Sequence, residues 1–254
     1  MLSKSQISLL TSLQHKKNRI EYGLFLVEGH KSVIEFMNSS YQAEAIYYTP
    51  PFDPKMLKLS RKINLCEISV RDMEKISGFK TPQDVIALIK IPAWPAISNA
   101  QLKQKFSIVL DGIQDPGNMG AIIRTADWFG ITHIICSLDT ADVYNPKVVQ
   151  ASMGSLARIK VYYSNLAAFL PQVGLPLFGA MLQGESIYKT NFGAEGLIVM
   201  GNEGGGIRPE ISALINKAVT IPRTGKAESL NVSIAAALFC SEISRNSNNN
   251  IGSQ

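Results

Sequence analysis

The feature that most constrains the fold is a regular alternation of short apolar runs with helix-like segments, which begins at Phe106. Apolar runs of this length are typical of buried parallel strands. They are FSIVLD (106–111), THIICS (132–137), IKVYYS (159–164), LPLFGAM (175–181), LIVMGN (197–202) and KAVTIP (217–222). Helix-like segments lie between most of them, at 118–130, 146–156, 165–170 and 208–216. The alternation predicts an α/β domain built on a parallel sheet, with ligands bound beyond the carboxyl ends of the strands.

A smaller α/β unit is predicted before this domain. Its expected strands are GLFLVEG (23–29), EAIYYT (44–49) and NLCEIS (64–69), and its expected helices are HKSVIEFMNS (30–39) and VRDMEKISG (70–78). The Pro-containing stretch that follows has polar flanks and suits a linker. We therefore predict a small domain over 1–90, a linker over 91–104, the main domain over 105–246 and a polar, disordered tail over 247–254.

Charge and cysteine content narrow the range of partners. The 25 Lys and Arg residues exceed the 20 Asp and Glu residues, which gives a net charge of +5 and favours a polyanionic partner. Three cysteines in apolar surroundings, without a CxxC pair, indicate neither a disulfide framework nor a bound metal. No secretory signal or membrane span is predicted, so the expected compartment is the cytoplasm. Because no acid precedes Glu21, an organellar targeting role of the amino terminus stays open.

The first unusual loop is DPGNMGAIIRTADWFG (115–130), which joins a strand to a helix. Asn118 is a candidate helix cap, and Arg124 is expected to point away from the apolar face of the helix. That face consists of Met119, Ile122, Ile123 and Ala126. Two interpretations of Arg124 stay open: a surface ion pair with Asp127, or a phosphate contact beside a helix amino terminus.

Two further loops are chemically unusual. VMGNEGGGIRPE contains Gly201 and Gly204 to Gly206, which let a ligand approach the backbone, but it fits neither the dinucleotide fingerprint nor the P-loop. Glu203 would repel a phosphate, so a cationic or neutral ligand suits this loop better. In IPRTGKAESLNVSIAAA, Ser229 or Asn231 either caps the last helix or contacts a ligand. The last helix is predicted to pack through one stripe of small and apolar residues, namely Val232, Ala235, Ala236, Phe239 and Ile243.

In this order and at these separations, the three loops resemble the three motifs of the SpoU (TrmH-like) family of RNA ribose methyltransferases, within the SPOUT superfamily. QASMGSLARIKVYY also fits the family. KKNRIEYGLFLVEGHKSVIE and TPQDVIALIK resemble the accessory RNA-binding domain of the family, which is related to L30e-like ribosomal proteins. The resemblance covers nearly the whole chain except the linker and the tail.

The resemblance implies a fold that general rules disfavour, because knots are rare in proteins. The main domain of this chain is expected to form a deep trefoil knot, with S-adenosylmethionine bound against the loops of the knot. The expected assembly is a homodimer with the sites near the subunit interface. The implied reaction is methyl transfer from S-adenosylmethionine to a ribose 2′-hydroxyl of structured RNA, with ribosomal RNA favoured over transfer RNA. Rival hypotheses are a transfer-RNA ribose methyltransferase, an RNA-binding protein without catalysis, and a Rossmann-type nucleotide enzyme that lacks its GxGxxG loop.

The resemblance also assigns residues. It places Arg124 at the ribose hydroxyl, and Asn118 beside it, orienting either the arginine or the ribose. Glu203 either fixes its loop or meets Arg124 of a second subunit. Ser229, which contacts either the substrate or the cofactor, and Asn231 complete the catalytic set. A guanidinium stays protonated, so we expect Arg124 to bind the adjoining phosphate while that phosphate or water accepts the proton. The implied cofactor contacts are Met181, Leu182, Gly201, Asn202, Gly204, Gly206, Ile221, Ser229, Leu230 and Asn231.

For RNA contacts the sequence offers Lys16, Lys17, Arg19 and Lys31 in the small domain, with Arg124 and Arg223 in the main domain. Lysine contacts to phosphate would add affinity without sequence preference. A solvated helix face explains the small-domain residues equally well, and a surface position explains Arg223. A fragment that starts after Lys90 is predicted to fold as a dimer that binds the cofactor but recognises RNA poorly.

Overall fold

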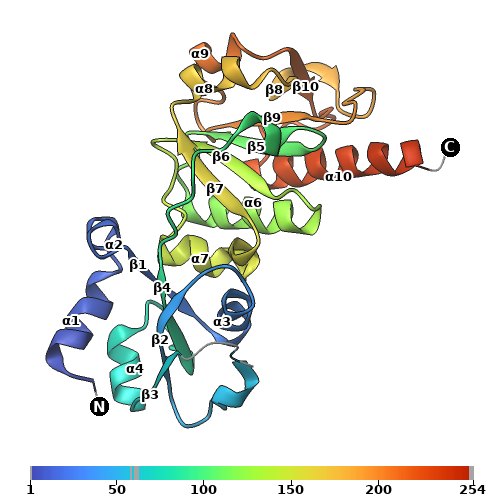
Figure 1. Ribbon diagram of the computed structural model, residues 1–254. Helices are drawn as coiled ribbons and strands as arrows, with labels where there is room; N and C mark the ends of the chain where they lie inside the picture. Colours follow the sequence, from blue (N-terminus) through green and yellow to red (C-terminus); the bar gives the residue numbers. More distant parts are fainter. Residues whose placement is uncertain (1, 58, 60–62, 252–254) are drawn as a thin grey trace. The chain divides into compact units, whose positions relative to one another are not determined.

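The structure is a computed structural model that describes residues 2–57, 59 and 63–251. The chain forms two compact units. The amino-terminal unit consists of residues up to Trp94 together with Asp142–Arg158, and the carboxy-terminal unit consists of Pro95–Ala141 with the residues from Ile159 onward. Each unit has a sheet of its own, and each is described separately below (Figure 1).

The amino-terminal unit is built on a four-stranded sheet in the order β1-β4-β2-β3. Strand β4 is antiparallel to β1 and β2, whereas β2 and β3 are parallel. The predicted strands and helices of this region are present, and their apolar side chains form the core of the unit. The strands are β1 (Leu24–Glu28), β2 (Ala43–Tyr48), β3 (Asn64–Glu67) and β4 (Val85–Lys90). The helices are α1 (Lys4–Ser12), α2 (Lys16–Tyr22), α3 (His30–Met37), the 3-10 turn η1 (Pro54–Leu57) and α4 (Val70–Ile76).

Helix α7 (Pro146–Ser152) and the 3-10 turn η2 (Ser155–Ala157) belong to the amino-terminal unit, although they follow a strand of the other unit in sequence. Val148 and Val149 of α7 are buried, and α7 packs on β1. Tyr144, just before the helix, lies with its ring centroid 4.6 Å from that of Phe25. This segment therefore contributes to the core of the amino-terminal unit.

The carboxy-terminal unit is built on a six-stranded sheet in the order β10-β8-β9-β5-β6-β7. Every adjacent pair is parallel, as the runs of apolar residues predict. The strands are β5 (Phe106–Asp111), β6 (His133–Ser137), β7 (Lys160–Ser164), β8 (Leu177–Ser186), β9 (Gly196–Gly201) and β10 (Lys217–Thr220). The helices are α5 (Asn99–Leu102), α6 (Pro116–Trp128), α8 (Leu166–Val173), α9 (Pro209–Ser212) and α10 (Val232–Ile251).

Some element boundaries differ from the predicted ones. The stretch expected as a linker contains α5, and α9 is one turn instead of the predicted 208–216. Strand β8 continues to Ser186, past the predicted end at Met181. The apolar pattern did not predict this second half, because it is largely exposed and carries polar residues. Helix α10 reaches Ile251 and so overlaps the predicted tail 247–254, of which residues 252–254 lie outside the described part.

Helix α10 packs against α6 and β9 along the predicted stripe (Figure 1). Val232, Ala236, Phe239 and Ile243 are buried, and Ala235 is partly buried. On α6 the predicted inner face, Met119, Ile122, Ile123 and Ala126, is also fully buried. The packing of these two apolar faces fixes the starts of both helices, where the polar groups of the candidate site lie.

Candidate functional site

The site lies beyond the carboxyl ends of strands β10, β8, β9 and β5, which are neighbours in the parallel sheet. Parallel strands present their carboxyl ends at one edge, so the loops that follow them come together there. The three unusual loops of the sequence follow β5, β9 and β10. The topology thus brings together segments that are about a hundred residues apart.

Asn118 joins the three loops. Its Nδ2 donates to Glu203 Oε1 at 2.7 Å, and its Oδ1 accepts from Asn231 Nδ2 at 2.9 Å. Since a carboxylate only accepts hydrogen bonds, Glu203 fixes which side of the Asn118 amide faces it. The predicted catalytic residues Asn118, Glu203 and Asn231 therefore lie in one hydrogen-bonded row within this chain.

Of the two predicted helix caps, the one at α6 is wrong and the one at α10 is present at Asn231. Asp115, not Asn118, caps α6, because its Oδ1 accepts from the backbone N–H of Asn118 at 2.7 Å. Asn118 is thus inside the first turn, and its side chain is available for the row. At α10, Asn231 Oδ1 accepts from Ser233 N at 2.9 Å, so Asn231 both caps the helix and donates to Asn118.

The loop after β9, residues 202–206, is called the glycine loop here. It is closed by two backbone hydrogen bonds between Asn202 and Gly206, of 3.0 and 2.9 Å. Asn202 Oδ1 also accepts from the backbone of Gly204 and Gly205, at 2.9 and 3.2 Å. Asn202 Nδ2 donates to the carbonyl of Gly112 at 2.7 Å. Asn202, predicted as a cofactor contact, therefore uses its side chain to shape the loop.

The glycines of this region differ in what the protein itself requires of them. A Cβ at Gly201 would lie 2.1 Å from the carbonyl carbon of Gly206, which no side chain tolerates. Gly206 has a φ of +68°, which favours glycine. Gly205 has neither restriction, since nothing lies within 4 Å of its ideal Cβ. Its bare, exposed backbone leaves room for a ligand to approach.

The cofactor contacts predicted at Met181 and Leu182 lie inside β8, and they are close to the residue predicted just after β10, Ile221. Strand β8 pairs with β10 at Phe178 and Gly179 and again from Glu185, with a register shift between these stretches. The intervening part holds Met181, which is partly buried, and Leu182, which is 76% exposed. The Leu182 carbonyl accepts from Thr220 Oγ1 at 3.1 Å, which ties it to the residue before Ile221.

Segment 222–231 leads from β10 to α10 and is exposed throughout, including Ser229 and Leu230. Arg223 donates to the carbonyl of Ala227 at 3.0 Å, within the same segment. The segment therefore combines exposed backbone with basic side chains.

Arg124 is exposed on α6. It lies about 9 Å from Asn118 along the helix axis, since each residue of a helix rises by about 1.5 Å.

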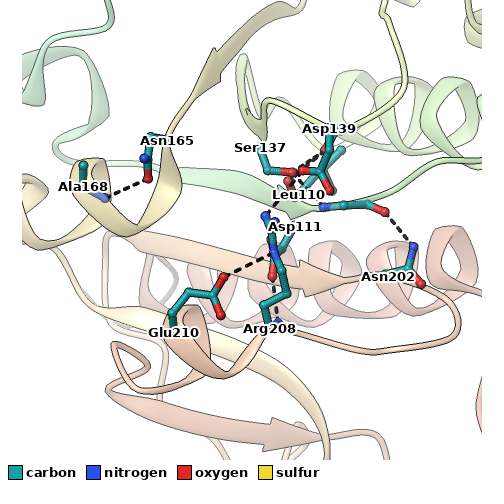
Figure 2. Close-up of polar contacts among 11 residues, drawn as sticks. Leu110, Asp111, Ser137, Asp139, Asn165, Ala168, Asn202, Arg208 and Glu210 are labelled. Carbon is teal, nitrogen blue, oxygen red and sulfur yellow. Dashed lines mark hydrogen bonds and ion pairs between the residues drawn. The ribbon is translucent and has the colours of Figure 1, made fainter.

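Two residues of the site, Asp111 and Arg208, were not predicted from the sequence. Asp111 ends β5 and is buried, and Arg208 follows the glycine loop (Figure 2). Asp111 accepts from Arg208 through the backbone N–H at 2.8 Å, through Nε at 2.7 Å, and through Nη2. The hydrogen bond to Asp111 raises the pKa of Arg208. The available signal was a charged residue at the end of an apolar strand.

Arg208 also faces two further carboxylates. Its Nη2 lies 3.5 Å from Asp139 Oδ1, and its Nε lies 3.9 Å from Glu210 Oε1. A hydrogen bond from Ser137 lowers the pKa of Asp139, which keeps this carboxyl ionised. The guanidinium is thus surrounded by negative charge.

In the amino-terminal unit, Lys16, Lys17 and Lys31 are exposed, as an RNA contact requires. The prediction for Arg19 is wrong. Arg19 is 2% exposed, pairs with Asp142 at 2.6 Å, and donates to the carbonyls of Leu13 and Gln14 at 2.8 and 2.9 Å. A side chain with these partners cannot reach an RNA phosphate.

Two absences concern only the described residues. No helix in that part of the chain is long and apolar enough to cross a membrane. The same residues hold no cluster of three or more His, Cys, Asp or Glu suited to a metal ion.

Comparison with known proteins gives two family matches. Residues 105–241 match the SpoU rRNA methylase family, and residues 4–87 match the MRM3-like substrate binding domain. One relative is the 23S rRNA (guanosine(2553)-2′-O)-methyltransferase RlmP of Bacillus subtilis, 29% identical over 89% of this chain and 91% of the relative. Another is the 23S rRNA (guanosine-2′-O-)-methyltransferase RlmB of Acinetobacter baylyi, 31% identical over 75% of this chain and 83% of the relative.

Solved structures agree over almost the whole length. A Porphyromonas gingivalis protein assigned to the TrmH family of RNA methyltransferases is 41% identical, with a TM-score of 0.85 over 95% of this chain and 98% of that one. An AdoMet-bound rRNA methyltransferase from Sinorhizobium meliloti is 25% identical, with a TM-score of 0.86 over 96% of each chain.

Proposed function

Because the chain belongs to the SpoU rRNA methylase family, we propose that it transfers a methyl group from S-adenosylmethionine to a ribose 2′-hydroxyl of ribosomal RNA. The observation that carries this proposal is the row Glu203–Asn118–Asn231, which links the three loops at one edge of the sheet. The ribosomal relatives favour ribosomal RNA over transfer RNA as the substrate.

The described residues fit S-adenosylmethionine. Gly205 leaves bare backbone that a Cβ would otherwise cover, and Leu182 and Leu230 supply exposed apolar surface. Peptide N–H and C=O groups suit an adenine edge. We assign cofactor binding to the glycine loop, to Met181 and Leu182, and to the stretch from Ile221 to Asn231. Gly201 and Asn202 act by shaping the loop, as their contacts indicate.

The sulfonium of S-adenosylmethionine supplies the methyl group and a good leaving group. In the reaction the C–S bond breaks, the C–O bond forms, and the hydroxyl proton leaves. The protein has to align the ribose and stabilise its oxygen. Arg124 serves this purpose as a permanent cation that binds the adjoining phosphate, and the phosphate or water takes the proton. Asn118, held between Glu203 and Asn231, orients the ribose side of the site.

Assembly, knot and location complete the proposal. We infer a homodimer with the sites near the subunit interface, and a trefoil knot in the carboxy-terminal unit around the glycine loop and segment 222–231. The protein acts in the cytoplasm. Lys16, Lys17, Lys31 and Arg223, which are all exposed, contact RNA phosphates.

The test is a methylation assay. The protein, S-adenosylmethionine and unmodified ribosomal RNA are incubated, and nuclease digests are analysed by mass spectrometry. We expect one 2′-O-methylnucleoside. Methylation of a base, methylation of transfer RNA alone, or RNA binding without S-adenosylmethionine binding would each contradict the proposal.

Arg124→Ala is expected to lower kcat by about a hundredfold or more, the scale on which an oxyanion-type contact acts, while the Kd for S-adenosylmethionine stays nearly unchanged. Calorimetry and single-turnover assays measure the two effects. Arg71→Ala is the matched control, because Arg71 is exposed on α4 in the other unit. An Arg124→Ala enzyme with the parental rate would exclude the assigned role.

A further inference from the structure

We propose that Asp111 and Arg208 are positioning residues, which hold the glycine loop in place and so set the position of Glu203. The inference rests on the proposed function, because the loop is assigned there to the cofactor. It adds two residues to the site, neither of which touches substrate in this proposal.

The glycine loop is anchored at its far end by Arg208 and Asp111. Asp111 is fully buried as a side chain and receives three hydrogen bonds from Arg208, one from the backbone and two from the guanidinium (Figure 2). A buried carboxylate is stable only when it is paired and hydrogen-bonded in this way. The pair therefore fixes Arg208, two residues after the loop, to the end of β5.

The glycine loop is anchored at its near end by Asn202. Asn202 donates to the carbonyl of Gly112, the residue after Asp111, at 2.7 Å (Figure 2). Gly112 has a φ of +73°, and its own N–H donates to Ser137 Oγ of β6 at 2.9 Å. Consecutive residues at the end of β5 thus hold both ends of the glycine loop.

The two anchors act on the site through Glu203. β5 lies in the interior of the sheet, between β9 and β6, so its end is a rigid support. Glu203 follows Asn202 directly, and it holds the Nδ2 of Asn118. A shift of the loop would move Glu203 and release Asn118, and misplacement by about 1 Å is enough to slow a reaction strongly.

The charges around Arg208 argue against the obvious alternative, a phosphate contact. The guanidinium is 43% exposed and could in principle meet RNA. However, Asp111, Asp139 and Glu210 surround it, so three carboxylates face one cation. A phosphate brought here would meet a net negative field, which favours a structural partner for Arg208 over an RNA ligand.

The experiment uses the full chain with Arg208→Gln, Arg208→Lys and Asp111→Asn. Glu210→Gln is the matched control, because Glu210 is the most distant of the three carboxylates and exposed. The measurements are the Kd for S-adenosylmethionine, the KM for RNA, kcat, thermal stability, and hydrogen exchange of the peptide that spans the glycine loop. Double-mutant cycles combine Arg208→Gln with Glu203→Gln.

For Arg208→Gln we expect faster exchange confined to the glycine loop, about tenfold weaker S-adenosylmethionine binding, and an unchanged KM for RNA. Arg208→Lys should recover part of the affinity, and Glu210→Gln should behave like the parent. The Arg208 and Glu203 substitutions should be less than additive in kcat, because both act through one loop.

Two outcomes would overturn the inference. A higher KM for RNA with unchanged cofactor affinity would make Arg208 an RNA contact. Lower thermal stability with parental Kd, kcat and loop exchange in the folded protein would make the pair merely structural. If the parent itself shows no methylation, the proposed function fails, while the exchange data still test whether Arg208 anchors the loop.

Discussion

At the scale of single residues, Asn118 shows why a side chain's role depends on its neighbours. The sequence predicts a helix cap at Asn118, but Asp115, three residues earlier, takes that role instead. What the sequence could not show is that Glu203 and Asn231 reach both ends of the Asn118 amide. Their positions depend on β9 and α10, which are distant in sequence. Burial of Arg19 escaped prediction for the same reason, since its partner Asp142 is far along the chain.

Asn118→Asp should disable the site. The new carboxylate would face Glu203, and two acceptors of like charge cannot form the bond that the amide forms. We expect kcat to fall by about tenfold, with the fold intact, since the hydrogen bond of 2.7 Å is replaced by repulsion between two carboxylates. Steady-state kinetics and circular dichroism measure this. Asn99→Asp, exposed on α5, is the control, and equal kinetics for the two variants would refute the role of the row.

His133 should give the protein an acid-sensitive step. Burial lowers its pKa to about 4 from the ordinary 6.5, so as pH falls the unfolded chain takes up the proton first. The contribution of His133 to the free energy of unfolding is therefore constant above about pH 6.5 and falls as the pH drops from 6.5 to about 4. Urea titrations of the parent and of His133→Gln measure the effect, and the variant should show a flatter profile. Equal slopes in His133→Gln and in the parent would contradict the assignment.

At the scale of elements, the strands were predictable and the loops were not. Six apolar runs predicted six parallel strands, because burial on both faces leaves a plain signal in the sequence. The order of the strands and the register shift in β8 depend on contacts between distant segments, which no local pattern encodes. The glycine loop was recognised by composition, but its anchors were not. Asp111 looked like an ordinary strand end, and Arg208 like the start of a helix.

Gly201, which precedes the glycine loop, and Gly205, within it, should respond differently to substitution by alanine. Gly201→Ala places a Cβ 2.1 Å from backbone, so the loop must open, and we expect a loss of stability of about 1–3 kcal/mol. Gly205→Ala meets nothing, so stability should stay within about 0.5 kcal/mol while cofactor affinity falls. Chemical denaturation and calorimetry separate the two effects. Full cofactor affinity in Gly205→Ala would remove that residue from the ligand surface.

At the scale of the whole molecule, the existence of two units was predictable, but the segments that make up each unit were not. The boundary near Trp94 agrees with a change in sequence pattern, whereas the inclusion of Asp142–Arg158 in the amino-terminal unit had no signal. Helix α7 looked like one more helix of the main domain, because apolar faces do not reveal which core they join. Val148 and Val149 pack in the amino-terminal unit.

The place of Asp142–Arg158 in the amino-terminal unit changes the expectation for a truncated chain. A fragment that starts at Pro95 would lose the partners of α7 and expose Val148 and Val149 to water. We expect it to aggregate more readily than the full chain, with burial lost at about 25 cal/mol per Å². Size-exclusion chromatography and thermal unfolding measure this, and the same fragment with Val148→Ser and Val149→Ser should be more soluble. A monodisperse fragment as stable as the parent would contradict the expectation.

The route of the chain has a consequence for engineering chimeras. The polypeptide passes from one unit to the other after Trp94, after Ala141 and again after Arg158. A chimera joined only at the linker would take the segment before the linker from one relative and α7 from the other. It would therefore separate the residue equivalent to Arg19 from the carboxylate equivalent to Asp142. Swapping target recognition between relatives therefore requires two exchanged pieces, chosen together.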